Sequence, residues 1–147
     1  MGATLAALLA AGLSAAERAP RAVVVRDAAG DVVAREALPT NGDFALAYRH
    51  SVYGVPAREL FAARGAGFNL RALASPRAAV LDYYALAGRR TRGRGWQRLE
   101  LRRPRRLRRL SLIATSTGRR TLLVGPRRVP LYGAGARHLT LTVEGGS

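Results

Sequence analysis

The 147-residue chain contains no cysteine and no lysine. Without cysteine, a disulfide framework, a cysteine-ligated zinc site and a lipid anchor attached to cysteine are all excluded. Histidine is also scarce, with two residues far apart in the chain, and only nine residues are acidic. The sequence therefore predicts no metal site and no cofactor, and it contains neither a glycine-rich nucleotide-binding loop nor a G-x-S-x-G nucleophile elbow.

Because lysine is absent, all 25 basic residues are arginine, and the formal net charge is +16. The charge is uneven: residues 1–88 hold nine arginines and seven acids, whereas residues 89–147 hold sixteen arginines and two acids. Arginine without lysine, together with abundant alanine and glycine, is typical of a GC-rich genome. Evolved phosphate-binding surfaces usually mix in lysine, so the composition argues against nucleic acid as the partner despite the high charge.

The first sixteen residues are apolar and uncharged, with four leucines in an alanine background. Small residues at 14–16 resemble a signal-peptide cleavage site, but the basic region that normally opens a signal peptide is missing. The segment is also shorter than the roughly 20 apolar residues that span a bilayer. Residues 1–19 are interpreted as a degenerate signal peptide or as a leading helix, followed by a single domain at residues 20–147. The signal peptide predicts a periplasmic or extracytoplasmic, membrane-associated protein, and the helix predicts a cytoplasmic one.

The remainder of the chain is divided by turn-forming residues into short apolar segments. Apolar and polar residues alternate over residues 44–52, which indicates a strand. Turn signals recur about every 8–12 residues, as in all-β sandwiches and barrels. We therefore expect an all-β, single-domain sandwich or barrel of about eight to ten short antiparallel strands. For residues 75–84 the sequence allows two interpretations, a helical turn or another strand. Residues 102–106 are expected to form a charged turn around Pro104.

Polar side chains are densest in residues 44–61, which read as a strand, a turn and a returning strand. His50 and Ser51 are neighbours, and neighbours on a strand point to opposite faces, so they cannot form a direct nucleophile–base hydrogen bond. A hairpin could bring Glu59 close to His50, where the carboxylate would raise the pKa of the imidazole. Such a pair is found in buried links between strands, in ligand-binding pockets and in acid–base sites.

Tyrosines supply further candidates, because a tyrosine can pack in the core or present its hydroxyl in a pocket. Asp82 precedes two adjacent tyrosines, one of which can join a pocket that contains His50. No residue is assigned a catalytic role. The candidate ligand-binding residues are His50, Ser51, Glu59, Tyr48 and Tyr83.

Residues 89–109 hold eleven arginines and a single acid, Glu100. Such a segment can contact an anionic polymer, anionic lipid headgroups or an acidic protein, or it can be a solvated face of a strand pair. Trp96 is its only aromatic residue, whereas single-strand binders interleave stacking aromatics with basic residues. The candidate face for a polyanion or a partner consists of Arg102, Arg103, Arg105, Arg106 and Arg108.

Residues 48–61 read Tyr-Arg-His-Ser-Val-Tyr-Gly-Val-Pro-Ala-Arg-Glu-Leu-Phe. This segment resembles the Tyr-x-His-Ser-Val … Pro-x-x-Glu-x-Phe signature of an uncharacterised prokaryotic family, domain of unknown function 1850. Residues 114–122, residues 129–131 and the strand–turn–strand pattern at 23–38 are similar to that family too, so the resemblance covers about residues 20–145. It implies that His50, Ser51, Pro56 and Glu59 belong to a shared site.

The resemblance further implies a small extracytoplasmic domain, encoded beside or fused to membrane subunits of tripartite ATP-independent periplasmic transporters. It brings no activity with it. The leading hypothesis is therefore an accessory binding domain associated with a membrane transporter subunit, with its arginine-rich face toward anionic lipid or an acidic protein. Two alternatives remain: a nucleic-acid-binding β-barrel that uses the arginines of residues 89–128, and a small hydrolase that uses His50 with Ser51 or with a water held by Glu59.

Overall fold

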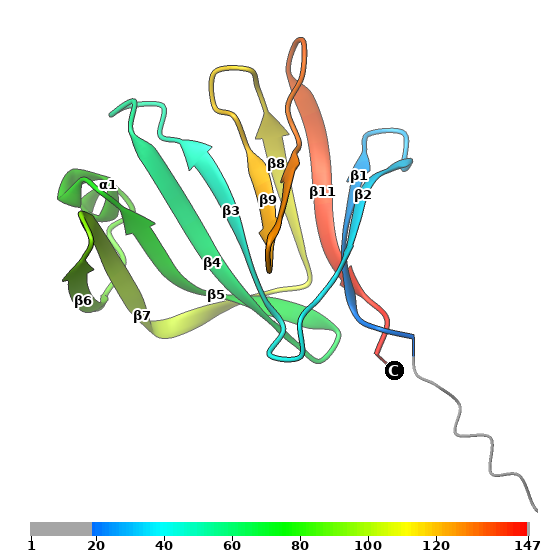
Figure 1. Cartoon of the computed structure of the whole chain (residues 1–147), viewed down its shortest axis with the longest axis horizontal. Coiled ribbons are helices and arrows are strands. Elements are labelled where there is room, and N and C mark those ends of the chain that lie inside the picture. Colours follow the sequence, from blue (N-terminus) through cyan, green and yellow to red (C-terminus); the bar gives the residue numbers. More distant parts are fainter. Residues whose placement is uncertain (1–18, 147) are drawn as a thin grey trace, which may run out of the picture.

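The computed structural model describes residues 19–146, which form eleven strands and one short helix (Figure 1). The strands pair antiparallel in one sheet of four and one of seven. The predicted all-β fold is confirmed, with more strands than the eight to ten expected. Over the described range neither sheet closes on itself, so the architecture is an open two-sheet sandwich and not a barrel. The predicted leader lies outside the described residues, except for Ala19.

Valine-rich segments build β1 and β2, two of the four strands of the smaller sheet, since β-branched side chains pack well on a pleated surface. Its strand order is β2-β1-β11-β8. Val23 and Val25 of the central strand β1 are fully buried and face the other sheet. The strands are β1 (Ala22–Asp27), β2 (Val32–Ala37), β8 (Arg109–Ala114) and β11 (Arg137–Glu144).

The larger sheet has the order β10-β9-β3-β4-β5-β7-β6. The alternation predicted around residues 44–52 is confirmed for its interior strand β3, where Phe44, Leu46 and Tyr48 are buried. That strand ends at Arg49, however, because residues 50–54 turn back toward β4. The strands are β3 (Asp43–Arg49), β4 (Pro56–Arg64), β5 (Gly67–Ser75), β6 (Gly88–Gly93), β7 (Trp96–Leu107), β9 (Thr121–Val124) and β10 (Arg127–Pro130).

The core lies between the two sheets and centres on the three phenylalanines of the chain. The rings of Phe44 and Phe61 stack with their centres 5.1 Å apart, and Phe68 meets them edge-on at 5.5 and 5.6 Å. Valines and leucines of the smaller sheet pack against this cluster. Packing of the core therefore decides which face of β3 and β4 points into the sandwich.

The open choice at residues 75–84 is decided in favour of a helix, α1 (Ala78–Tyr83). Leu81 of this helix is buried against leucines of β5 and β7, which holds the helix on the larger sheet. Its last residue, Tyr83, and the capping residue that follows, Tyr84, are thereby brought close to the turn that follows β3.

The charged turn expected at residues 102–106 is wrong, because these residues continue β7. Leu70 of β5 pairs with Arg105 and Ala72 pairs with Glu100, so residues 101–104 of β7 stand opposite one β5 residue. Pro104, which has no N–H to donate, falls in this bulge. The strand can therefore continue through a proline because the bulge removes it from regular pairing.

The two ends of the sandwich carry different features (Figure 1). At one end, the chain enters and leaves: Ala22 pairs with Glu144, and the Gly146 N–H donates to the Ala19 carbonyl at 3.2 Å. At the other end lie the turn after β3 and the loop between β8 and β9. These two connections position the candidate site.

Candidate functional site

The turn between β3 and β4 fixes the position of His50. Its N–H donates to the Val55 carbonyl at 2.9 Å, and its own carbonyl accepts from the Gly54 N–H at 2.7 Å. Gly54 has φ of +62°, a left-handed conformation that glycine adopts without a Cβ penalty. The backbone around the imidazole is therefore closed on itself by local hydrogen bonds.

The His50 side chain is packed among tyrosine rings, and only 3% of the residue is exposed. The Tyr83 ring lies edge-on to it at 4.8 Å, and the Tyr53 ring lies at 5.3 Å. The Tyr53 N–H donates to Nδ1 at 3.4 Å, which places the proton of the neutral imidazole on Nε2. Burial lowers the pKa of His50, because it disfavours the charged imidazolium. His50 is thus a neutral residue with Nε2–H as its donor.

A cavity of about 240 Å³ adjoins His50 at this end of the sandwich. Its wall joins three segments that are distant in sequence: the end of β3 with its turn, the end of α1, and residues 113–120. His50 is one of the residues that line the cavity, and its Nε2 makes no hydrogen bond with a described residue. The lining residues are Tyr48, Arg49, His50, Ser51, Tyr83, Tyr84, Ile113, Thr115, Gly118 and Arg120.

Arg120 is held in this wall from three sides. Its guanidinium carbon lies 4.9 Å from the centre of the Tyr48 ring, and its Nε donates to the Ile113 carbonyl at 3.2 Å. Glu59 lies behind the wall, with Oε2 3.8 Å from Nη1 of the arginine. Burial raises the pKa of Glu59, and the nearby positive charge of Arg120 opposes that rise. Glu59 therefore positions Arg120 and does not itself line the cavity.

The hydroxyl groups of Tyr48 and Tyr84 share a hydrogen bond. Burial is the largest cause that raises the pKa of each tyrosine, and the Glu59 carboxylate raises both further. Both phenols therefore remain protonated through the physiological range. The pair ties β3 to the end of α1 and so joins two parts of the cavity wall.

The structure brings together four of the five predicted ligand-binding residues, since Tyr48, His50, Ser51 and Tyr83 all line the cavity. Glu59 is the exception: it pairs in register with Leu46, and its ionic partner is Arg120. No hydrogen bond or ion pair joins His50 to Glu59 in residues 19–146. The expected rise in the His50 pKa is wrong, because desolvation acts on the imidazole without a carboxylate to oppose it.

Comparison with protein-family models, curated proteins and solved structures finds no match for this chain, so function is inferred from the geometry of the site itself. In the described part of the chain no group of three or more His, Cys, Asp or Glu is placed to hold a metal ion. Nor is any helix between residues 19 and 146 long and apolar enough to cross a membrane.

Sequence reasoning considered Tyr84 as one of the two adjacent tyrosines that could join the pocket, but it did not select Arg120 or Thr115. Arg120 and Thr115 belong to residues 114–122, the second segment for which the sequence suggested a likeness to domain of unknown function 1850, and that expectation was the available signal. The Arg49 N–H donates to the Gly118 carbonyl at 2.7 Å, which joins this segment to the first one. The two stretches that carry the resemblance therefore meet at the cavity.

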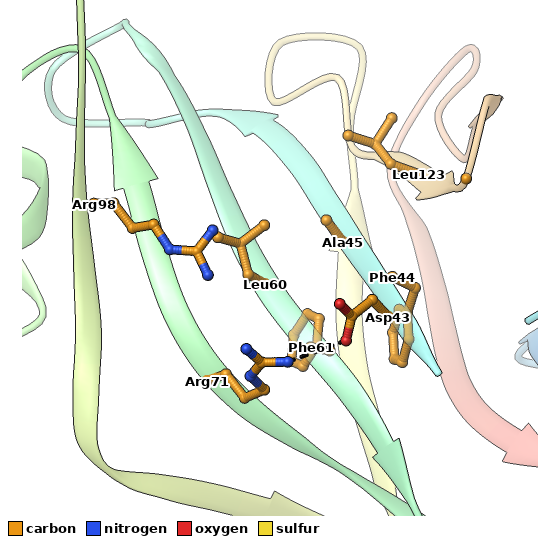
Figure 2. A pocket seen from close by; sticks show the side chains of 9 residues that line it. Asp43, Phe44, Ala45, Leu60, Phe61, Arg71, Arg98 and Leu123 are labelled. Atoms are coloured by element: carbon orange, nitrogen blue, oxygen red, sulfur yellow. Dashed lines mark hydrogen bonds and ion pairs between the residues drawn. The ribbon is translucent and has the colours of Figure 1, made fainter. Parts of the chain in front are cut away.

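A second cavity, of about 230 Å³, lies on the outer face of the larger sheet (Figure 2). Figure 2 shows Arg71 and the Asp43 carboxylate on the same side of the strands, and these two form an ion pair at 3.1 Å. Arg98, also in this wall, pairs with Glu100. This wall contains a carboxylate of its own, that of Asp43, whereas the wall beside His50 contains no acidic side chain among the described residues.

The arginines of the predicted polyanion or partner face are all exposed. They follow the second half of β7 and the corner that leads into β8, near the chain ends and away from the cavity (Figure 1). Arg102, Arg103, Arg105, Arg106 and Arg108 are thus a feature separate from the candidate site.

Proposed function

We propose that this protein is a binding domain that holds a small carboxylate in the cavity beside His50. The observation that carries the proposal is the chemistry of the wall, which contains Arg49 and Arg120 but no acidic side chain among the described residues. Hydrogen-bond donors surround the same space, because His50 offers Nε2–H and Ser51 and Thr115 offer hydroxyls. A cationic, donor-rich wall favours an anion with oxygen acceptors.

The size and the rings of the cavity narrow the ligand class. About 240 Å³ is below the roughly 300–1,000 Å³ of pockets for drug-sized ligands, so the ligand is small. Three tyrosine rings and one imidazole provide flat apolar surface for the rest of the molecule. A carboxylate with a short apolar or planar body matches both properties.

Binding is favoured over catalysis by the geometry around His50. No hydrogen bond connects the Ser51 hydroxyl to an imidazole in residues 19–146. Glu59 forms its ion pair with Arg120 and not with His50. A hydrolase would require the nucleophile, the base and the orienting carboxylate to contact one another in series. The hydrolase alternative therefore receives less support than a binding site.

The resemblance to domain of unknown function 1850 supports a place for this binding domain beside a membrane transporter. The signature segment at residues 48–61 and the similar segment at residues 114–122 meet at the cavity, as a shared ligand site would require. We therefore propose an extracytoplasmic accessory protein of a solute transporter. Co-purification with a transporter permease from native membranes is the expected result, and recovery as a free cytosolic protein would contradict this assignment.

Ligand binding is tested by titration calorimetry of the full chain with acetate, succinate and benzoate, using acetamide as a neutral control and inorganic phosphate as a second anion. At least one carboxylate is expected to bind saturably, and acetamide is not. Arg120→Met should weaken that binding about tenfold or more, since it removes a charge-assisted hydrogen bond. The matched control is Arg98→Met, which removes a paired arginine outside this cavity.

His50→Gln provides a second variant in case the Arg120 variant folds poorly, and circular dichroism checks the fold of each. It should lower carboxylate affinity, because the amide does not reproduce the position of Nε2–H. Absence of saturable binding by every carboxylate would refute the proposal. Equal affinities of Arg120→Met and Arg98→Met, or tighter binding of phosphate than of any carboxylate, would also refute it.

A further inference from the structure

Six arginines crowd the corner where the chain leaves the larger sheet and enters the smaller one. They occupy residues 102–109, interrupted only by Pro104 and Leu107, and every one is exposed. None of the six forms an ion pair with a residue in the described range, whereas seven other arginines do. We call Arg102, Arg103, Arg105, Arg106, Arg108 and Arg109 the basic corner.

The acidic groups at this end of the sandwich do not neutralise the basic corner. Asp43 is paired with Arg71 at 3.1 Å. Glu144 is paired with Arg26 and with Arg35, the latter at 2.9 Å. These contacts lower the pKa of Glu144, so its carboxylate stays ionised and paired with Arg26 and Arg35. The corner therefore presents uncompensated positive charge to solvent.

The point where the chain enters the sandwich adjoins the basic corner. An Arg21 Nη donates to the Gly65 carbonyl at 2.7 Å. A Cβ built on Gly65 would lie 3.8 Å from an Arg106 Nη, so this turn adjoins the basic corner. A Cβ built on Gly67, in the same turn, would lie 3.6 Å from the Arg108 Cα. The basic corner thus lies at the end of the domain where the described chain begins.

We propose that the basic corner docks this domain on a membrane surface rich in anionic phospholipid. Anionic headgroups attract arginines near the surface, at about 1 kcal/mol each, and six arginines without an ion-pair partner in the described range supply that attraction. The cavity lies at the opposite end of the sandwich (Figure 1). Docking through the corner therefore leaves the segments that line the cavity at the end of the sandwich away from the lipid.

The test is co-sedimentation of the full chain with phosphatidylcholine vesicles made with and without phosphatidylglycerol. The corner variant replaces Arg103, Arg105 and Arg106 with glutamine. The matched control replaces three exposed arginines outside the corner, Arg89, Arg92 and Arg128, with glutamine. It lowers the net charge by the same amount as the corner variant. Each arginine near the surface contributes a factor of about five, so the corner variant should lose about a hundredfold in partitioning onto anionic vesicles.

The control variant should retain its partitioning within a few-fold. Equal losses in the two variants would overturn the proposal, because net charge and not the corner would then govern binding. Partitioning that does not depend on phosphatidylglycerol would overturn it as well. So would a corner variant that loses affinity for single-stranded DNA while keeping its affinity for vesicles, which would identify nucleic acid as the occupant.

Orientation is tested separately, using the absence of native cysteine. A polarity-sensitive fluorophore is attached to Ala66→Cys, in the exposed turn beside the corner, or to Ser116→Cys, in the loop at the cavity end. The label at position 66 should become shielded on anionic vesicles, and the label at 116 should not. Shielding at 116 alone would overturn the orientation. Ligand affinity plays no part in either readout, so failure here is distinguishable from failure of the carboxylate site.

Discussion

The Arg49 N–H donates a 2.7 Å hydrogen bond to the Gly118 carbonyl. This bond joins the end of β3 to the loop between β8 and β9. Both residues line the cavity beside His50, together with the end of α1. The candidate site is therefore assembled from three connections at one end of the sandwich, and no single segment of the chain contains it.

Arg120 and Glu59 should be energetically coupled. Arg120→Met leaves a carboxylate that is 17% exposed without its nearest cation, which should lower the free energy of unfolding by about 1–3 kcal/mol. The double variant Arg120→Met/Glu59→Gln should recover part of that loss, because no buried charge is then left unpaired. Urea unfolding of the two single variants and the double variant measures the coupling.

The Arg98→Met variant is the control for this cycle, because Arg98 and Glu100 form a more exposed pair. It should change stability by less than about 1 kcal/mol. Strictly additive effects of the Arg120 and Glu59 substitutions would show that the two side chains do not interact.

His50 should titrate below the value of about 6.5 that is ordinary for histidine. Burial lowers its pKa in the folded protein, so between that pKa and about 6.5 the unfolded chain binds more protons. The contribution of His50 to stability is therefore present above about pH 6.5 and is lost as the pH falls. His50→Gln should show a smaller drop in unfolding free energy between pH 7 and pH 5 than the native protein.

The titration itself can be followed by NMR, because the chain has only two histidines and His138→Gln assigns the signals. A His50 midpoint above 6.5 would contradict the desolvated environment described for the imidazole. Such a result would favour a neighbouring carboxylate, as the sequence alone suggested.

Truncation of Phe68 should strongly lower the free energy of unfolding, and Phe68 does not line the cavity beside His50. Its ring is fully buried and packs edge-on against both Phe44 and Phe61. Phe68→Ala should lower the free energy of unfolding by about 3–5 kcal/mol, because it removes apolar contacts and leaves a void. Val32→Ala, at a position that is 50% exposed, should cost no more than about 0.5 kcal/mol. Similar losses in the two variants, measured by denaturant unfolding, would be inconsistent with the proposed core.

Several features of this protein were determined by the sequence itself. Alternation over residues 44–52 depends on the two-residue period of a strand, so it predicted β3 and its inner face correctly as far as Arg49, where the strand ends. Turn residues and β-branched runs likewise predicted an all-β fold. The same local reasoning failed at residues 102–106, where a bulge absorbs Pro104 and lets β7 continue. A bulge depends on the neighbouring strand, which local pattern does not specify.

For the candidate site, the sequence indicated His50, Ser51, Tyr48 and Tyr83 because reactive and aromatic residues cluster around one turn and one short segment. Which groups meet was decided by tertiary structure: register placed Glu59 opposite Leu46, and the return of residues 114–120 supplied Arg120 as its partner. The direction of the His50 pKa was also decided at this level, because it depends on burial among rings contributed by α1. Local pattern determines which way a side chain faces along its own strand, whereas distances between strands follow from how the sheets pack.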